Sequence, residues 1–302
     1  MATMVPYDEF SMFHENAEEF GIPYPGPPVV RRENVALGDN RSLSALVWGD
    51  ADPEYVFLHG GAQNAHTWDT VLLALGRPAV AIDLPGHGHS DNGANGYADL
   101  EVNARDIATV IRKLAPKAKA VIGMSLGGLT TILLAKQDPE VVRSVVLVDV
   151  TPGVTGQKAG AITAFVNGPD SFPDFDAILA RTVEHNPTRT VASLRRGILH
   201  NAEQHDDGSW VWRYARHRSF ETPDRSQSEV FNSMWDAVSG ITVPLMLVRG
   251  MRPQSVVADE DEVELLRRLP NAQVEHLDAG HSVQGDRPVE LAGLILGFPG
   301  QT

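Results

Sequence analysis

The sequence of 302 residues contains no cysteine. Disulfide bonds, metal sites built on thiolates and a cysteine nucleophile are therefore excluded. Basic residues are also scarce, because 25 Lys and Arg stand against 39 Asp and Glu and leave a formal net charge of −14. No run of five or six Lys or Arg residues offsets this charge. Nucleic acids and anionic membrane surfaces are accordingly not expected as partners.

Long apolar runs are missing as well. The longest nearly uncharged stretch, residues 120–135, includes glycines and a serine and falls short of the about 18 to 20 apolar residues that cross a bilayer. The N-terminus (MATMVPYDEFSMFHENAEEF) carries acidic residues where an export signal needs a basic start and an unbroken apolar stretch. We therefore expect a globular protein without a membrane span and take the cytoplasm as its default location.

The pattern of apolar residues predicts an α/β protein with one large core. Hydrophobic residues make up 42% of the chain, which favours one domain with an insertion over two independent units. Short β-branched runs predict buried strands at residues 55–58, 79–82, 120–122, 144–148 and 245–248. Runs with a 3.6-residue period predict helices at residues 97–114, 126–137, 259–269 and 288–298. Their alternation indicates a parallel sheet with helices on both faces, and alternating residues around Val35 and at 44–48 add an antiparallel hairpin at its edge.

The chain is expected to contain a cap over this core. Over ninety residues separate the strand that ends at Asp149 from the strand that starts near Pro244, far more than one crossover helix needs. The expected segments are an N-terminal extension without assigned chemistry (1–29), the first part of the core (30–152), the cap insertion (153–235) and the second part of the core (236–302). Aromatic residues of the cap could line a substrate pocket, although such residues more often pack a small core of their own. They are Phe165, Phe172, Phe175, Trp210, Trp212, Tyr214 and Phe220.

The five residues Gly123-Met-Ser-Leu-Gly127 follow an apolar run and precede a helical stretch. A strand-to-helix turn this tight crowds the backbone around the serine, so glycines are needed two residues to either side and the hydroxyl is pushed out over the sheet. Ser125 is therefore the candidate nucleophile. Taken alone, the motif also fits an ordinary glycine-rich turn.

A serine hydroxyl needs a base near neutral pH, and His281 is the best candidate for that base. It follows the last predicted strand, residues 273–277, in the loop Ala279-Gly-His-Ser282. His276 is expected within the strand and is disfavoured.

The third group must be a carboxylate that orients the imidazole and stabilises its protonated form. Asp149 ends the apolar run 144–148, so it is favoured for its place at the carboxyl end of a strand. The loop after residues 245–248 offers only Gln254 at a common acid position. The following acidic residues remain alternatives, although helix capping also explains them; they are Asp259, Glu260 and Asp261.

A serine nucleophile also needs backbone N–H donors for the oxyanion that develops on the substrate. The residue after the nucleophile supplies one, Leu126, and the loop His59-Gly-Gly61 after the third strand supplies the other, Gly61. Glycines at positions 60 and 61 let the backbone turn its amides toward Ser125. The alternative interpretation of this loop is a turn that leads into a helix.

Further candidates concern the substrate and a metal ion. We expect His66, Trp68 and Met124 to border the substrate, although the first two could simply begin the next helix. His87 and His89 form a His-x-His pair, but no further paired carboxylate or thiolate completes a four-ligand site, so a turn is favoured and no metal is expected.

These motifs, in this order, resemble those of the α/β-hydrolase superfamily. The similarity is closer to small mycobacterial-type serine esterases and covers about residues 30–300. It rests on Gly60-Gly-Ala-Gln-Asn-Ala-His-Thr-Trp-Asp69, Asp83-Leu-Pro-Gly-His-Gly-His-Ser90, Gly123-Met-Ser-Leu-Gly-Gly128, Leu147-Val-Asp-Val-Thr-Pro152, Gly208-Ser-Trp-Val-Trp-Arg-Tyr214, Leu247-Val-Arg-Gly250 and Gly280-His-Ser-Val-Gln284.

The resemblance implies a mostly parallel eight-stranded sheet flanked by helices, with a helical cap inserted after the sixth strand. It implies hydrolysis of short to medium acyl esters without a cofactor. The expected partner is a small-molecule ester, and the chain is expected to act as a monomer or homodimer. Ser125 would attack, His281 would transfer the proton, Asp149 would be the acid, and Gly61 with Leu126 would hold the oxyanion. Gln254 at a common acid position is a departure from the wider superfamily.

Other functions use the same groups. A thioesterase, a lactonase or a carbon–carbon bond hydrolase would need the same three side chains, since the cap and not the fold selects the substrate. A noncatalytic binding protein and a cofactor-free oxygenase or perhydrolase on this fold are alternatives from other classes. Oxygen consumption with a heteroaromatic substrate would identify the oxygenase.

Overall fold

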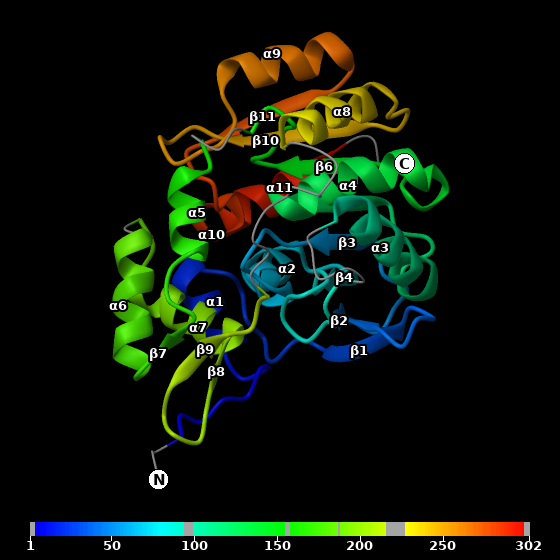
Figure 1. Ribbon diagram of the computed structural model, residues 1–302. Coiled ribbons are helices and arrows are strands. Elements are labelled where there is room, and N and C mark those ends of the chain that lie inside the picture. Colours follow the sequence, from blue (N-terminus) through cyan, green and yellow to red (C-terminus); the bar gives the residue numbers. More distant parts are fainter. Residues whose placement is uncertain (1–3, 94–98, 155–157, 187, 216–226, 299–302) are drawn as a thin grey trace.

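The computed structural model describes residues 4–93, 99–154, 158–186, 188–215 and 227–298 (Figure 1). Its main sheet has eight strands in the order β1-β2-β4-β3-β5-β6-β10-β11. β1 pairs with β2, and β2 with β4, in antiparallel fashion, while the remaining neighbours are parallel. This confirms the expected sheet and its edge hairpin. The strands are β1 (Val30–Ala36), β2 (Ser42–Trp48), β3 (Tyr55–Leu58), β4 (Ala79–Ile82), β5 (Ala120–Met124), β6 (Val145–Val148), β10 (Leu245–Gly250) and β11 (Gln273–Leu277).

Helices cover both faces of this sheet (Figure 1). One face carries α3 (Leu100–Leu114), α4 (Leu126–Gln137), α8 (Gln227–Ser239) and α9 (Asp259–Arg268). The other carries α1 (Phe13–Phe20), α2 (Asp69–Leu75) and α11 (Pro288–Gly297). Shorter elements are α10 (Val283–Asp286) and the 3-10 helices η1 (Ala65–Trp68) and η2 (Pro139–Val141). The helix expected from residue 97 begins at Leu100, and residues 97 and 98 lie outside the described residues.

The central strands are apolar on both faces because they are covered on both sides. Every residue of β3, β4 and β6 is buried, as expected for a parallel strand between two layers of helices. Side chains alternate between the layers, so Val56 packs with α3 and α4 whereas Phe57 packs with α2. Because these neighbouring strands are parallel, their carboxyl ends lie at one edge of the sheet, and the candidate residues follow directly there. The strands concerned are β3, β5, β6, β10 and β11.

The N-terminal segment is laid against the sheet. Phe13 of α1 is fully buried, and its ring lies 4.9 Å from that of Trp48 in β2. Gly21 ends the helix with a φ of +63°, a left-handed conformation that suits glycine. The segment is thus part of the packed structure between residue 4 and β1.

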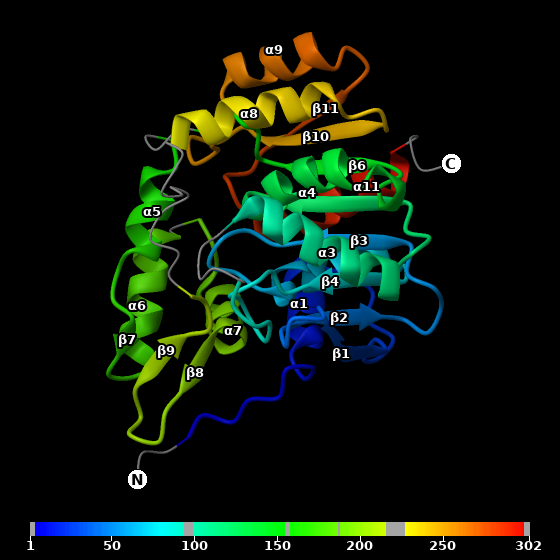
Figure 2. The ribbon, with the colours of Figure 1, turned by 45° about the vertical axis from the view of Figure 1, so that its right-hand side comes forward.

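The chain between β6 and β10 adds a layer beside one end of the sheet (Figures 1 and 2). It contains helices and also a small antiparallel sheet in the order β7-β9-β8. A helical insertion was expected, and the sequence did not predict this sheet. The expected boundary at residue 235 falls inside α8, which packs on α4 of the core. The added elements are α5 (Gly160–Val166), β7 (Ser171–Phe172), α6 (Phe175–His185), α7 (Val191–Asn201), β8 (Ala202–Gln204) and β9 (Trp210–Trp212).

Most aromatic residues of this layer pack against each other. Phe172 and Trp210 are buried in a separate apolar cluster with residues of α6 and α7. The Phe175 ring lies 5.0 Å from that of Trp210. Phe220 lies outside the described residues. Within the described part of the chain, no helix has the length and apolar character needed to cross a membrane.

The fold predicts a specific intolerance at the turn between β5 and α4. A Cβ added at Gly127 would lie 2.3 Å from the carbonyl oxygen of Leu58, because the helix starts directly against β3. We expect Gly127→Ala to lower the free energy of unfolding by about 1–3 kcal/mol in urea denaturation. Gly293→Ala in α11, where nothing lies within 4 Å of an added Cβ, should be neutral or stabilising. Equal stabilities of the two variants would contradict the close approach.

Candidate active site

Ser125 occupies a strained turn between β5 and α4. Its backbone has φ +50° and ψ −118°, a combination rarely adopted by a residue with a side chain. The turn is held because the Gly127 amide donates to the carbonyl of His59 (3.0 Å). An added Cβ at Gly123 would lie 2.5 Å from the Gly127 carbonyl oxygen, so both flanking glycines are needed. Ser125 is partly exposed whereas Met124 and Leu126 are buried.

Asp149 and His281 are joined by a hydrogen bond. The carboxylate is an acceptor only, so His281 Nδ1–H donates to Asp149 Oδ2 over 2.9 Å. Asp149 follows β6 directly and is completely buried. It accepts three further bonds, from the Gly250 amide (2.9 Å), the Ser255 hydroxyl (2.6 Å) and the Val256 amide (3.1 Å). Four donors thus compensate the removal of this charge from water.

This hydrogen bond determines which nitrogen of His281 is available. A neutral imidazole that donates through Nδ1 leaves Nε2 as its acceptor nitrogen. The loop that carries the ring is fixed on both sides, because the Gly280 amide donates to Asp286 (2.8 Å) and the Arg252 amide donates to the Ala279 carbonyl (2.9 Å). The side chain of His281 keeps 11% of its surface exposed, enough for contact with a bound molecule.

The other candidate carboxylates are engaged elsewhere. Asp259 forms an ion pair with Arg249. Asp261 binds Lys158 (2.6 Å) and accepts from the Ala258 amide at the start of α9. Glu260 is exposed. The structure therefore brings Asp149 to His281 and leaves the three acidic residues at the start of α9 in the capping role that the sequence also allowed. His276, which the sequence disfavoured, is an exposed residue bound to Glu262.

The loop after β3 lies against the serine. A Cβ at Gly60 would lie 3.3 Å from the Ser125 Cβ and 2.5 Å from the Met124 sulfur, so a side chain here would require Met124 to move. His59 holds the loop from below, because its Nδ1–H donates to the Gly60 carbonyl (2.7 Å) and its Nε2 accepts from the Leu84 amide (2.9 Å). Burial lowers the pKa of His59 to about 4, which keeps the ring neutral, as this pair of bonds requires.

Three further side chains fix the same loop. The sequence did not mark Gln63 or Asn201 as candidates, and His87 was considered only as part of a turn or a metal pair. Gln63 accepts from the Gly60 amide (3.1 Å), His87 Nε2 accepts from the Ala62 amide (3.1 Å), and the Asn201 amide group donates to the Ala62 carbonyl (2.6 Å). His87 thus supports the loop and is not half of a metal pair. Within the described part of the chain, the Gly61 and Leu126 amides donate to no protein acceptor.

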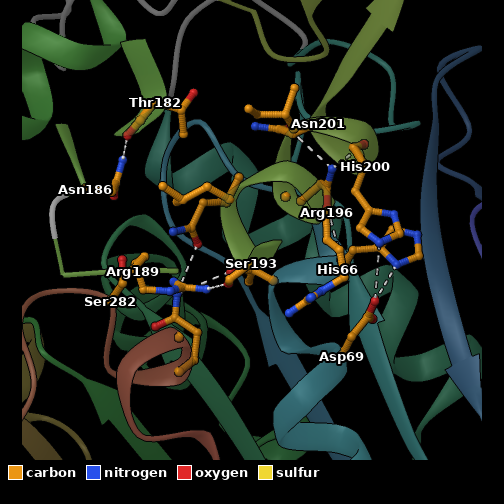
Figure 3. A pocket seen from close by; sticks show the side chains of 18 of the residues that line it. His66, Asp69, Thr182, Asn186, Arg189, Ser193, Arg196, His200, Asn201 and Ser282 are labelled. Carbon is orange, nitrogen blue, oxygen red and sulfur yellow. Dashed lines mark hydrogen bonds and ion pairs between the residues drawn. The ribbon is translucent and has the colours of Figure 1, made fainter. Parts of the chain in front are cut away.

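The structure separates the three expected substrate contacts. His66 lines a cavity of about 190 Å³ (Figure 3). Trp68 is fully buried, with its ring 5.1 Å from that of Phe57 in the core. Met124 is buried beneath Gly60. Only His66 among the three therefore lines the cavity. The sequence could not separate the three residues, because a residue's position in a motif does not reveal the direction of its side chain.

His66 belongs to a buried network that reaches the N-terminal segment. Its Nδ1 lies 2.9 Å from Asp69, its Nε2 lies 3.3 Å from Glu9, and its ring stacks on that of His200 at 3.8 Å. Burial opposes a charge on this ring, but the two carboxylates outweigh it and raise the pKa of His66 to about 9. Tyr7 completes the network through His200 Nδ1 (2.9 Å).

The network also contains the one group of metal-ligating side chains found among the described residues. Ligand atoms of His66, Asp69 and His200 lie within 4.8 Å of one another. A metal ion would have to displace the proton that Asp69 and Glu9 stabilise on His66, and the guanidinium of Arg32 lies 3.5 Å from the same ring. The arrangement therefore suits a protonated His66 better than a bound metal ion.

Comparison with known proteins places this geometry among hydrolases. The model of the alpha/beta hydrolase family matches residues 55–294. The chain is 44% identical to the esterase Rv0045c of Mycobacterium tuberculosis over 299 residues, which cover 96% of this chain and 95% of the relative. It is 28% identical to the sn-1-specific diacylglycerol lipase ABHD11 of Mus musculus, with 88% of each chain covered.

Solved structures agree with these similarities. A structure of Rv0045c, 44% identical in sequence, has a TM-score of 0.84 and covers 97% of this chain and 99% of its own. The structure of E-2-(acetamidomethylene)succinate hydrolase is 25% identical, has a TM-score of 0.75, and covers 89% of this chain and 99% of its own.

The raised pKa of His66 predicts how stability changes with pH. A folded pKa of about 9 lies above the unfolded value of about 6.5. Its contribution is therefore fully present below pH 6.5 and is lost as the pH rises through 9. Between pH 6.5 and 9.5, the wild type should lose on the order of 2 kcal/mol more unfolding free energy than His66→Gln does. Parallel profiles for the two proteins in urea denaturation would show that His66 is not charged in the folded state.

Proposed function

The chain belongs to the alpha/beta hydrolase family, and on this premise we propose that it is a serine ester hydrolase for short to medium acyl esters. The observation that carries the proposal is the Asp149–His281 hydrogen bond at the same sheet edge as the strained Ser125. The 44% identity to a named esterase over nearly the whole chain supports the same reaction class. No cofactor takes part in the proposed mechanism.

In the proposed mechanism, Ser125 Oγ attacks the ester carbonyl while its proton passes to His281 Nε2. The carbonyl oxygen becomes an oxyanion, which accepts hydrogen bonds from the Gly61 and Leu126 amides. These amides suit that role because they have no protein acceptor within the described residues. Collapse of the tetrahedral intermediate releases the alcohol, which takes the proton from His281, and leaves an acyl group on Ser125. Water, deprotonated by His281, then attacks the acyl group, and collapse of the second tetrahedral intermediate releases the acid while His281 returns the proton to Ser125 Oγ.

Asp149 acts through His281 in this scheme. It holds the Nδ1–H tautomer, so that Nε2 is the basic nitrogen, and it stabilises the imidazolium that forms after attack. Its three other donors keep the carboxylate in place and satisfied throughout the cycle. We call residues 59–63, which follow β3, the oxyanion loop. His59 and Gln63 bind the backbone of Gly60 and so position the neighbouring Gly61 amide.

We further propose that the segment from residue 153 to the start of α8 acts as the cap. Its residue Asn201 binds the oxyanion loop directly, so the cap and the reaction centre are mechanically connected. The cavity beneath it is walled by both units, with His66 and Ser282 from the core and Phe165 and Trp212 from the cap. Substrate selection by the cap would follow from this arrangement.

Ester hydrolysis by the wild type and by Ser125→Ala tests the proposal. Initial rates on p-nitrophenyl esters from acetyl to palmitoyl should show turnover of short or medium chains by the wild type, and a loss of about a thousandfold or more in the variant. The chain length with the highest rate would give the size of the acyl pocket. Absence of turnover in the wild type, or equal rates in the variant, would contradict the proposed ester hydrolase function. Either result would favour a noncatalytic binding protein or a cofactor-free oxygenase.

The identity of the acid is tested by Asp149→Asn against Asp259→Asn. The asparagine at 149 removes the charge and the tautomer control, so kcat should fall by about 10⁴-fold, as in the serine protease triad from which this magnitude is taken. Asp259, whose side chain is 90% exposed at the start of α9, should tolerate the same change with little effect. Circular dichroism of both variants serves as the folding control. A larger loss from Asp259→Asn would assign the acid to α9.

A further inference from the structure

Arg189 carries a positive charge that has no carboxylate beside it. It lies in the connection between α6 and α7, and its Nη2–H donates to the Ser193 hydroxyl (2.5 Å). Within the described part of the chain, no carboxylate oxygen lies within the 4.0 Å of an ion pair with its guanidinium. Arg196, seven residues later, differs because it pairs with Glu19 and donates to Asn16. A guanidinium has five N–H donors, so most of those on Arg189 are available to a ligand.

The two carboxylates that influence the pKa of Arg189 most, Asp286 and Glu19, each bind other groups. Glu19 pairs with Arg196 and accepts from the Thr190 hydroxyl. Asp286 accepts from the Gly280 amide (2.8 Å) and faces Arg252. Both lie beyond ion-pair distance from Arg189. Burial lowers the pKa of Arg189, and these two carboxylates only partly oppose that effect. Arg189 is partly buried, and a charge withdrawn from water without an opposite charge is costly unless a ligand neutralises it.

The guanidinium lies against the segment that carries His281. A Cβ added at Gly285 would be 1.9 Å from Arg189 Nη1, so the guanidinium rests on the backbone of α10. α10 begins at Val283, two residues after His281. Figure 3 shows Arg189 beside Ser193 and Ser282, facing the interior of the cavity.

The cavity that Arg189 lines also touches residues next to both loops of the candidate active site, although Ser125 and His281 themselves are not among its lining residues. Its wall includes Gln63, which holds the Gly60 amide next to Ser125, and Ser282, which follows His281. Gln284 also lines it, and the side-chain oxygen of this residue is buried without a hydrogen-bond partner. The cavity is therefore polar on the side of Arg189, with a volume of about 190 Å³, so it suits a small charged group better than the end of a long alkyl chain.

We infer that Arg189 binds a free carboxylate of the substrate, so that the preferred substrates are half-esters of dicarboxylic acids. The planar guanidinium offers parallel N–H donors that match the two oxygens of a carboxylate. The ester group would lie at Ser125 and the carboxylate at Arg189, on either side of the His281 segment. This inference rests on the proposed ester hydrolase and adds a substrate class to it.

A pair of esters matched in length tests the inference. Monomethyl adipate and methyl hexanoate share the methyl ester and differ in that one ends in a carboxylate and the other in a methyl group. The wild type should prefer monomethyl adipate in kcat/KM, measured by pH-stat titration. Arg189→Met should lower kcat/KM for monomethyl adipate by about ten- to a hundredfold, as expected for a charged hydrogen bond, and leave methyl hexanoate within about twofold.

Two further variants serve as controls. Arg189→Lys should retain part of the preference, because it keeps the charge and loses the fork. Arg195→Met removes an exposed arginine from α7, the helix that follows Arg189, and should leave the rates on both substrates unchanged. An equal loss on both esters in Arg189→Met would mean that Arg189 only supports the loop, and would overturn the inference. A wild type without preference for monomethyl adipate would overturn it as well.

A binding measurement separates failure of this inference from failure of the proposed function. Adipate should raise the Tm of Ser125→Ala, which cannot turn over, and should not raise that of Ser125→Ala with Arg189→Met. If the wild type hydrolyses no ester but adipate gives this difference, the carboxylate site stands and the hydrolase proposal fails. If adipate raises neither Tm, or raises both equally, the site is wrong whatever the activity.

Discussion

Asp149 is a charged group with no exposed surface, and its four hydrogen-bond donors come from two segments, residues 250–256 and His281, that lie more than 100 residues after it in the sequence. The Gly250 amide ends β10, Ser255 and Val256 lie in the loop that follows, and His281 follows β11. A single carboxylate therefore joins the ends of β6, β10 and β11. Removing any one donor would leave part of a buried charge unsatisfied, which is costly in a protein interior. The orientation of His281 depends on the completeness of this set.

The second constraint is the close packing around Ser125. The strained backbone of this residue persists because α4 begins directly against β3 and the loop that follows it, where Gly127 leaves no room for a side chain and Gly60 packs against Met124 and Ser125. His59 and His87 then act as supports, each through a hydrogen bond to the backbone of that loop or its neighbour. Strain at one residue is thus maintained by many contacts in the rest of the sheet.

The sequence predicted the parts of this site that depend on chain order and spacing. Ser125, His281 and Asp149 were predicted together because each follows an apolar strand, and the carboxyl ends of parallel strands share one edge. The buried position of Trp68 in the core was not predictable, since the direction of a side chain depends on tertiary packing. The support by Asn201 was missed for the same reason, because its bond to Ala62 joins residues 139 apart in the sequence. The support by Gln63 is local, since it binds Gly60 three residues away, but it too depends on the direction of a side chain. No periodicity marks Arg189, which was singled out because none of the described carboxylates lies within ion-pair distance of it.

The central claim is that Ser125 is activated by His281 held by Asp149, and covalent labelling tests it most directly. An organophosphate such as paraoxon phosphorylates an activated serine and leaves unactivated hydroxyls unmodified. The account predicts one adduct per chain by intact mass, located on the peptide that contains Ser125, and a far slower reaction in Asp149→Asn. An adduct on another residue, no adduct at all, or an unchanged rate in Asp149→Asn would contradict the account.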